Sequence, residues 1–125
     1  MNSIDFEKMD GLVPAIIQDA RTKNVLMLGF MNKEAYEKTI QSGFVTFYSR
    51  TRKKIWMKGE ESGNTLKVID IAIDCDNDTL LIKANPAGPV CHTGAATCFA
   101  DSNEYGVEFF DYLQKFIQRR FQEMP

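Results

Sequence analysis

Residues Leu66 to Cys98 read LKVIDIAIDCDNDTLLIKANPAGPVCHTGAATC, and this stretch decides the fold. The segment Leu66–Ile73 is rich in β-branched residues and predicts a strand. A period of two places three isoleucines on one face of this strand: Ile69, Ile71 and Ile73. Asp76 to Asp78 has the composition of a tight turn, and Thr79–Ala84 predicts the strand that returns. We therefore expect an antiparallel hairpin that leads into the cysteine-containing segment.

Two further hairpins are predicted upstream of this stretch. Leu12–Gln18 and Val25–Phe30 flank a segment of turn residues, and Pro14 indicates an edge position or a bulge in the first of these strands. Phe44–Ser49 alternates aromatic and β-branched residues, and Ile55–Lys58 follows it as a short return strand.

Two helices complete the predicted elements. Asn32 suits an N-cap and Gly43 lies just past a helical end, with one short amphipathic face between them that contains Ala35, Tyr36, Thr39 and Ile40. Apolar residues recur at helical spacing over about 106–122 and predict a C-terminal helix. The sequence therefore predicts a mainly β domain of the α+β class, mostly antiparallel, with one short helix and one C-terminal helix.

Length and composition limit the classes of protein that fit. A chain of 125 residues fits a single domain over residues 1–125, and 44% apolar with 26% charged residues is ordinary for a globular protein. A formal net charge of −2 gives no general attraction to nucleic acid or to an anionic membrane. No apolar run approaches the ~20 residues of a membrane span, and the N-terminus lacks a signal-peptide pattern, so we expect a cytoplasmic protein.

The chain contains three cysteines, spaced C-x15-C-x6-C: Cys75, Cys91 and Cys98. An odd number cannot pair fully within one chain, so buried thiol, nucleophile or metal ligand are the alternatives in a reducing compartment. Three thiols with His92, the only histidine, could form a closed zinc site, although adjacent residues such as Cys91 and His92 seldom reach one metal together. Three thiolates with an open fourth position would instead make a catalytic zinc site, in which water is activated near neutral pH. His92 would then be available for proton transfer; its alternative is a structural hydrogen bond.

Three aspartates alternate beside Cys75: Asp74, Asp76 and Asp78. Aspartate is common in turns for structural reasons alone. The run does not fit an EF-hand loop, because Thr79 and Asn85 occupy the places of its glycine and glutamate. Three close carboxylates repel one another unless a cation neutralises them, which favours a magnesium-type site with oxygen ligands.

A basic stretch surrounds Trp56 and contains Arg50, Arg52, Lys53, Lys54 and Lys58. A solvated basic turn is one explanation. Arginine also suits phosphate, and the glycines of Gly59–Asn64 can direct backbone amides at an anion. We therefore take Arg50, Arg52 and Lys58 as candidates to bind the phosphates of a small molecule.

Three motifs in order resemble the phosphoribosyl-AMP cyclohydrolase family of histidine biosynthesis. They are FVTFYSRTRKKIWMKGEESGN (Phe44 to Asn64), LKVIDIAIDCDND (Leu66 to Asp78) and PAGPVCHTGAATCF (Pro86 to Phe99). LMLGFMNKEAY (Leu26 to Tyr36) is similar to the family as well, so the resemblance covers roughly residues 10 to 100. The zinc deaminases of nucleobases, which share related chemistry, carry an H-x-E pattern, whereas Gly94 stands two residues after His92 here.

The resemblance implies a zinc- and magnesium-dependent hydrolase that opens the adenine ring of phosphoribosyl-AMP between N1 and C6, giving the formimino aminoimidazole carboxamide ribonucleotide. It implies a β pseudo-barrel and a homodimer with one zinc per subunit, bound by Cys75 of one subunit and by Cys91 and Cys98 of the other. The three aspartates would bind magnesium, and His92 would transfer protons. Some members are fused to a pyrophosphohydrolase; this chain ends one predicted helix beyond Phe99, so we expect that activity to be absent.

Two other classes of function remain as alternatives. A small zinc-stabilised module that binds a nucleotide without catalysis would use the same cysteines and basic stretch. A thiol-redox protein fits less well, because the chain has no C-x-x-C pair.

Overall fold

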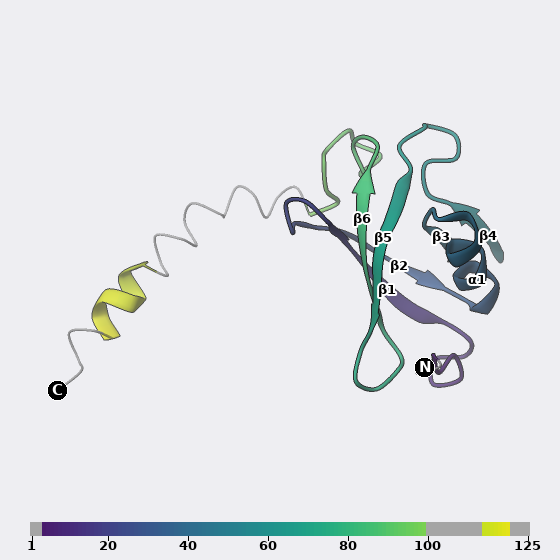
Figure 1. Cartoon of the computed structure of the whole chain (residues 1–125), viewed down its shortest axis with the longest axis horizontal. Helices are drawn as coiled ribbons and strands as arrows, with labels where there is room; N and C mark the ends of the chain where they lie inside the picture. Colours follow the sequence, from purple (N-terminus) through teal and green to yellow (C-terminus); the bar gives the residue numbers. More distant parts are fainter. Residues whose placement is uncertain (1–3, 100–113, 121–125) are drawn as a thin grey trace.

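The structure is a computed structural model that describes residues 4–99 and 114–120 (Figure 1). Its elements in chain order are β1 (Val13–Asp19), β2 (Val25–Met31), α1 (Lys33–Ser42), β3 (Thr46–Ser49), β4 (Lys54–Met57), β5 (Leu66–Ile73) and β6 (Leu80–Pro86). Each lies within two residues of an element that the sequence predicts. The mainly β, α+β fold class is therefore confirmed.

The C-terminal helix is described only in part. Residues 114–120 are helical and lie inside the helix predicted over 106–122, while the rest of that prediction lies outside the described residues. Within the described part of the chain, no helix is both long and apolar enough to span a lipid bilayer.

Two hairpins meet side by side in a four-stranded sheet of order β2-β1-β6-β5. The β1–β2 and β5–β6 pairs are antiparallel, whereas β1 and β6 pair in parallel at the centre, from Ala15 opposite Leu80 to Asp19 opposite Ala84. The β3–β4 hairpin is also antiparallel. The mostly antiparallel prediction is therefore confirmed, and the central parallel pair is a feature that it did not include.

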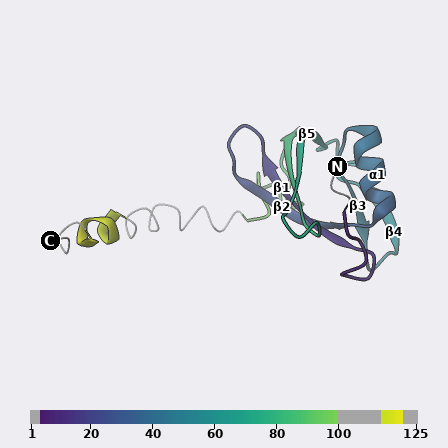
Figure 2. The ribbon, with the colours of Figure 1, turned by 60° about the horizontal axis from the view of Figure 1, so that its bottom comes forward.

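The β3–β4 hairpin and α1 pack against each other and against β2, on the same side of the molecule (Figure 2). Phe44, just before β3, bridges to Lys67 on β5, and β3 also contacts β2. The chain at and just before β3 thus reaches both edge strands of the first sheet, which is itself open, and the pseudo-barrel stays a prediction. Strict alternation on β1 and β6 directs the core side chains of these strands into the enclosed space: Val13, Ala15, Ile17, Leu80, Ile82 and Ala84.

Helix α1 begins and ends where its capping residues predict. Asn32 accepts a hydrogen bond from the N–H of Ala35 at 2.8 Å, and Gly43 adopts the left-handed conformation with φ 80°. Ala35 and Thr39 are buried as expected, but Ile40 is 56% exposed. The assignment of Ile40 to the packed face is therefore wrong.

Two other details of the sequence prediction are wrong. Pro14 lies on an internal strand, and the register shift of β1 falls between Ile17 and Gln18, so Pro14 marks neither an edge nor a bulge. It is tolerated because pairing with β6 begins only at Ala15. On β5 the pairing register shifts between Val68 and Asp70, so Ile69 is an extra residue and is 51% exposed, while Ile71 and Ile73 pack against the core. A bulge changes which residues share a face, and periodicity alone does not reveal it.

Gly29 on β2 gives a direct test of core packing. A Cβ at this position would lie 2.5 Å from ring atoms of Phe47, which is 1% exposed. We expect Gly29→Ala to lower the free energy of unfolding by about 1–3 kcal/mol, measured by urea denaturation, because overpacking forces the ring to move. Combining it with Phe47→Leu should cost less than the sum of the two single changes. Strict additivity would contradict the close contact.

Candidate active site

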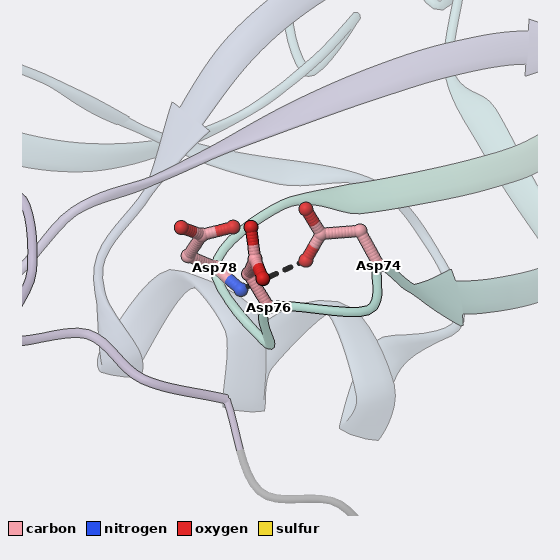
Figure 3. Close-up of side chains that lie close together, drawn as sticks. All are labelled: Asp74, Asp76 and Asp78. Atoms are coloured by element: carbon pink, nitrogen blue, oxygen red, sulfur yellow. Dashed lines mark hydrogen bonds between the residues drawn. The ribbon is translucent and has the colours of Figure 1, made fainter.

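The turn between β5 and β6 brings the three aspartates together (Figure 3). Asp74, Asp76 and Asp78 can each direct one carboxylate oxygen so that all three oxygens lie within 4.8 Å of one another. Asp74 accepts hydrogen bonds from the backbone N–H groups of Asp78 at 3.0 Å and Thr79 at 3.2 Å. The N–H of Asp78, followed by that of Thr79, holds the pKa of Asp74 below its ordinary value, so this carboxylate is charged at neutral pH.

The structural role of an aspartate in a turn explains only part of this cluster. Asp74 closes the turn, and Asn77 supplies the left-handed residue with φ 61°. Within residues 4–99 and 114–120, however, the carboxylate of Asp76 makes no hydrogen bond or ion pair. Three carboxylate oxygens held this close together are suitable ligands for a hard divalent cation such as magnesium.

The segment after β6 brings Cys91 and Cys98 together. Cys91 begins a tight turn, and the hydroxyl of Thr93 donates to its Sγ at 3.1 Å. Thr97, which is 5% exposed, donates to the carbonyl of Val25 at 2.7 Å, and the N–H of Cys98 donates to Leu26 at 2.8 Å. These bonds tie the cysteine loop to the start of β2.

The two thiols differ in acidity because their surroundings differ. The Thr93 hydroxyl, helped by the Thr93 N–H, lowers the pKa of Cys91 below its ordinary value. Partial burial raises the pKa of Cys98, and the neighbouring Cys91 raises it further. Of the two thiols, Cys91 therefore loses its proton the more easily, and a cation such as zinc would favour the thiolate form of both.

Cys75 lies at the opposite end of the sheet. It follows β5 in the aspartate turn, whereas Cys91 follows β6, and a seven-residue strand at about 3.3 Å per residue separates the two ends by about 20 Å. Consistently, among the described residues the aspartates form the only group of three potential metal ligands that converge. Within one chain, Cys75 therefore does not join Cys91 and Cys98.

The basic residues lie in two places, at the β3–β4 turn and near the cysteine pair. The guanidinium of Arg50 lies 4.3 Å from the ring centroid of Phe30, and Arg52 is exposed on the β3–β4 turn. Lys58 lies just after β4, and its charge lowers the pKa of both Cys91 and Cys98, behind the larger effects described above. His92 is exposed beside Cys91. Lys58 and His92 thus belong to the same end of the molecule as the cysteine pair.

The glycine-containing loop lies against the cysteine-bearing segment. The N–H of Ala87 donates to the carbonyl of Thr65 at 2.9 Å, and a Cβ on Gly88 would collide with the side chain of Asn64. Only glycine permits this approach at residue 88. The loop Gly59–Asn64 therefore lies beside the segment that carries Cys91 and Cys98, where the expected role in anion binding would place it.

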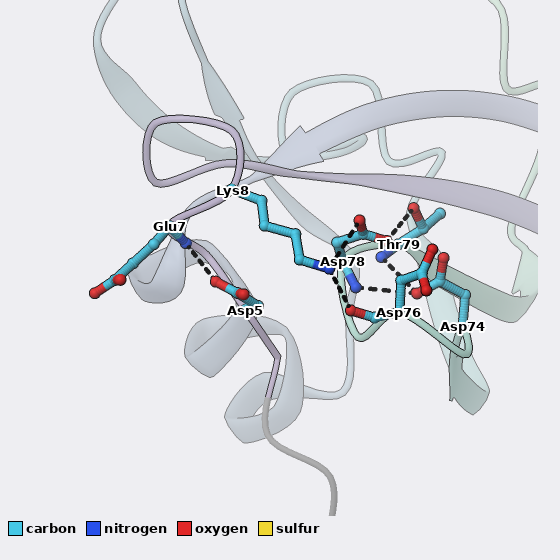
Figure 4. A network of polar contacts seen from close by, with 7 residues as sticks. All are labelled: Asp5, Glu7, Lys8, Asp74, Asp76, Asp78 and Thr79. Atoms are coloured by element: carbon cyan, nitrogen blue, oxygen red, sulfur yellow. Dashed lines mark hydrogen bonds and ion pairs between the residues drawn. The ribbon is translucent and has the colours of Figure 1, made fainter.

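Sequence patterns did not identify three of the residues that build these sites. Thr93 and Thr97 were not expected to hold the cysteine loop, and Lys8, which contacts the aspartate turn (Figure 4), had no assigned role. The T-x-x-x-T spacing inside the cysteine motif was the available signal for the threonines. No local signal connects Lys8 to a turn 68 residues away.

Comparison with known proteins gives a consistent result. Residues 27–100 match the family model described as phosphoribosyl-AMP cyclohydrolase. The histidine biosynthesis bifunctional protein HisIE of Bacteroides thetaiotaomicron is 65% identical over 122 residues, which are 98% of this chain and 60% of the relative. The proteins of the same name from Campylobacter jejuni and Salmonella typhimurium are 58% and 52% identical, over 94% of this chain and 57% and 58% of each relative.

The chain spans about three-fifths of the length of these curated relatives. The matched residues include all the aspartates, cysteines and basic residues that the sequence proposes for the site, together with His92, whereas Lys8 lies outside the matched range. The chain belongs to the phosphoribosyl-AMP cyclohydrolase family.

Proposed function

We propose that this chain hydrolyses the N1–C6 bond of the adenine ring in phosphoribosyl-AMP, as a cytoplasmic enzyme of histidine biosynthesis. The observation that carries this proposal is the family match over residues 27–100, which contains every site residue that the sequence predicted. In the reaction, the oxygen of water becomes the carboxamide oxygen at C6, and N1 leaves C6 with a proton.

The site is completed by a second copy of the chain. Cys91 and Cys98 supply two neighbouring thiols, and the third thiol, Cys75, lies at the far end of the same subunit. A zinc ion with three thiolate ligands therefore fits if Cys75 comes from a partner subunit. When bound, zinc supplies an activated water for attack on C6.

The outer face of the four-stranded sheet supports such a homodimer. Leu28, Ile16, Leu81 and Ala72 are cross-strand partners and form one apolar row over all four strands. Leu28 is 47% exposed and adjoins the other apolar side chains of this row, so the single chain leaves apolar surface uncovered here. Two such faces packed about a two-fold axis perpendicular to the strands would exchange the ends of the sheet. That arrangement brings the β5–β6 turn of one copy towards the cysteine loop of the other.

The chain's other residues then have distinct tasks. The aspartates would hold magnesium, whose positive charge would favour the substrate's phosphates, and Arg50, Arg52 and Lys58 bind these two phosphates. Lys58 acts closest to the thiols, and the exposed His92 moves a proton between water and N1. One nucleotide substrate would thus contact both groups of residues, with its phosphates at the basic side chains and its purine ring at the cysteines.

Turnover of phosphoribosyl-AMP tests the proposal directly. We expect the zinc-loaded protein with magnesium to open the purine ring, measured as a change in ultraviolet absorbance, and to lose this activity on zinc chelation and regain it on zinc addition. AMP, which has no phosphoribosyl group on N1, should not react. A protein that binds phosphoribosyl-AMP tightly and never turns it over would instead be the zinc-stabilised binding module.

A further inference from the structure

The N-terminal segment is fixed against the aspartate turn (Figure 4). The N–H of Asp5 donates to the carbonyl of Asn77 at 2.7 Å, and Lys8 Nζ donates to the carbonyl of Asp76 at 2.8 Å. Lys8 Nζ also lies 3.5 Å from Oδ2 of Asp78 and forms an ion pair with it. Three contacts thus connect two segments that are far apart in the sequence.

Packing elsewhere holds Lys8 in this position. Phe6 and Ile4 are partly buried against the core, and the ring of Phe6 lies 6.2 Å from that of Tyr36 on α1. The N–H of Gly11 donates to the carbonyl of Phe6 at 2.7 Å and closes the turn that contains Lys8. The lysine is therefore presented by an ordered backbone.

We propose that Lys8 is the resident counter-cation of the aspartate cluster, which a divalent cation must displace when it binds. This inference rests on the proposed magnesium site. The ammonium group and a divalent cation compete for the same carboxylate, Asp78, and like charges that share one carboxylate repel each other. Magnesium binding is consequently coupled to release of the contacts between the N-terminal segment and the turn.

Magnesium titration of the zinc-loaded dimer tests this competition. Lys8→Gln removes the charge and keeps a donor for Asp76, and we expect it to bind Mg²⁺ about three- to tenfold more tightly than the wild type, measured calorimetrically without substrate. Lys8→Arg keeps the charge and should bind as the wild type does. Lys54→Gln removes an exposed charge on β4 and serves as the matched control, with unchanged affinity.

Hydrogen exchange of the Asp5 amide gives a second readout. This N–H donates to Asn77, so saturating Mg²⁺ should speed its exchange several-fold in the wild type. In Lys8→Gln, Mg²⁺ should change this exchange less than it does in the wild type, because no ammonium group has to leave Asp78 when the metal binds. Unchanged or weaker Mg²⁺ binding by Lys8→Gln, or an Asp5 amide that stays slow in the magnesium-bound wild type, overturns the proposal.

Asp76→Asn separates failure of this inference from failure of the magnesium site. If Asp76→Asn weakens Mg²⁺ binding but Lys8→Gln does not change it, the aspartates bind the metal and the role of Lys8 is refuted. If Asp76→Asn also leaves the affinity unchanged, the ion binds elsewhere and both proposals fall.

Discussion

Mixing inactive Cys75→Ala chains with inactive Cys91→Ala chains should restore about one quarter of wild-type turnover. Each variant alone lacks one ligand in both sites of its homodimer. A mixed dimer, however, contains one site that takes Cys75 from one subunit and both Cys91 and Cys98 from the other. Random exchange makes about half of the dimers mixed, each with one intact site of two. Turnover of phosphoribosyl-AMP after joint refolding, with zinc content per subunit, measures the result.

The matched control mixes Cys91→Ala with Cys98→Ala. These two cysteines lie in the same loop of one chain, so every mixed dimer lacks a ligand in each site and no activity should return. Full activity in any of the single variants would remove the cysteines from catalysis altogether. Absence of recovery in the first mixture, with mixed dimers demonstrably formed, would refute the shared site.

His92→Ala should lower kcat by about 10²–10⁴-fold, because general acid–base catalysis by one residue contributes on this scale. KM should change little, since the proposed role of His92 is in proton transfer and not in holding phosphate. The side chain is exposed beside Cys91, where a substrate can reach it. Steady-state kinetics of the zinc-loaded variant gives both constants.

Added imidazole distinguishes this role from a structural one. A proton-transfer defect should be partly rescued by free imidazole, whereas a distorted cysteine loop should not be. Zinc content must remain that of the wild type, because His92 adjoins a proposed ligand. A two- or three-fold effect on kcat would assign His92 a structural role.

Local signals predicted the elements and the aspartate cluster well, because both depend on short-range chemistry. The caps at Asn32 and Gly43 set the ends of α1, and the turn at Asp74 depends on hydrogen bonds within five residues. Long-range features were not accessible in the same way. Alternation on β1 indicates which of its side chains are buried, but it does not indicate that β1 pairs with β6. The bulge at Ile69 changes which β5 side chains face the core, and no feature of the composition reveals it.

The candidate site follows the same division. Motifs identified the ligating residue types, and the strand predicted over Thr79–Ala84 already separates Cys75 from Cys91 along the chain. The sequence does not show where the two cysteines lie relative to each other in space. The contact from Lys8 to the aspartate turn depends on where the N-terminal segment packs, which is a property of the tertiary fold. Such contacts become visible only in three dimensions.

The parallel pairing of β1 with β6 has a consequence for biosynthesis of the chain. Ala15 meets Leu80, so one side of β1 has no partner until β6 has left the ribosome. During that interval the nascent β1–β2 hairpin presents an unpaired edge, and such an edge invites association with other chains. Contacts between residues so far apart in sequence also slow folding. Cells that overproduce this polypeptide should therefore depend on chaperones that bind nascent chains, because these chaperones cover the unpaired strand until β6 arrives.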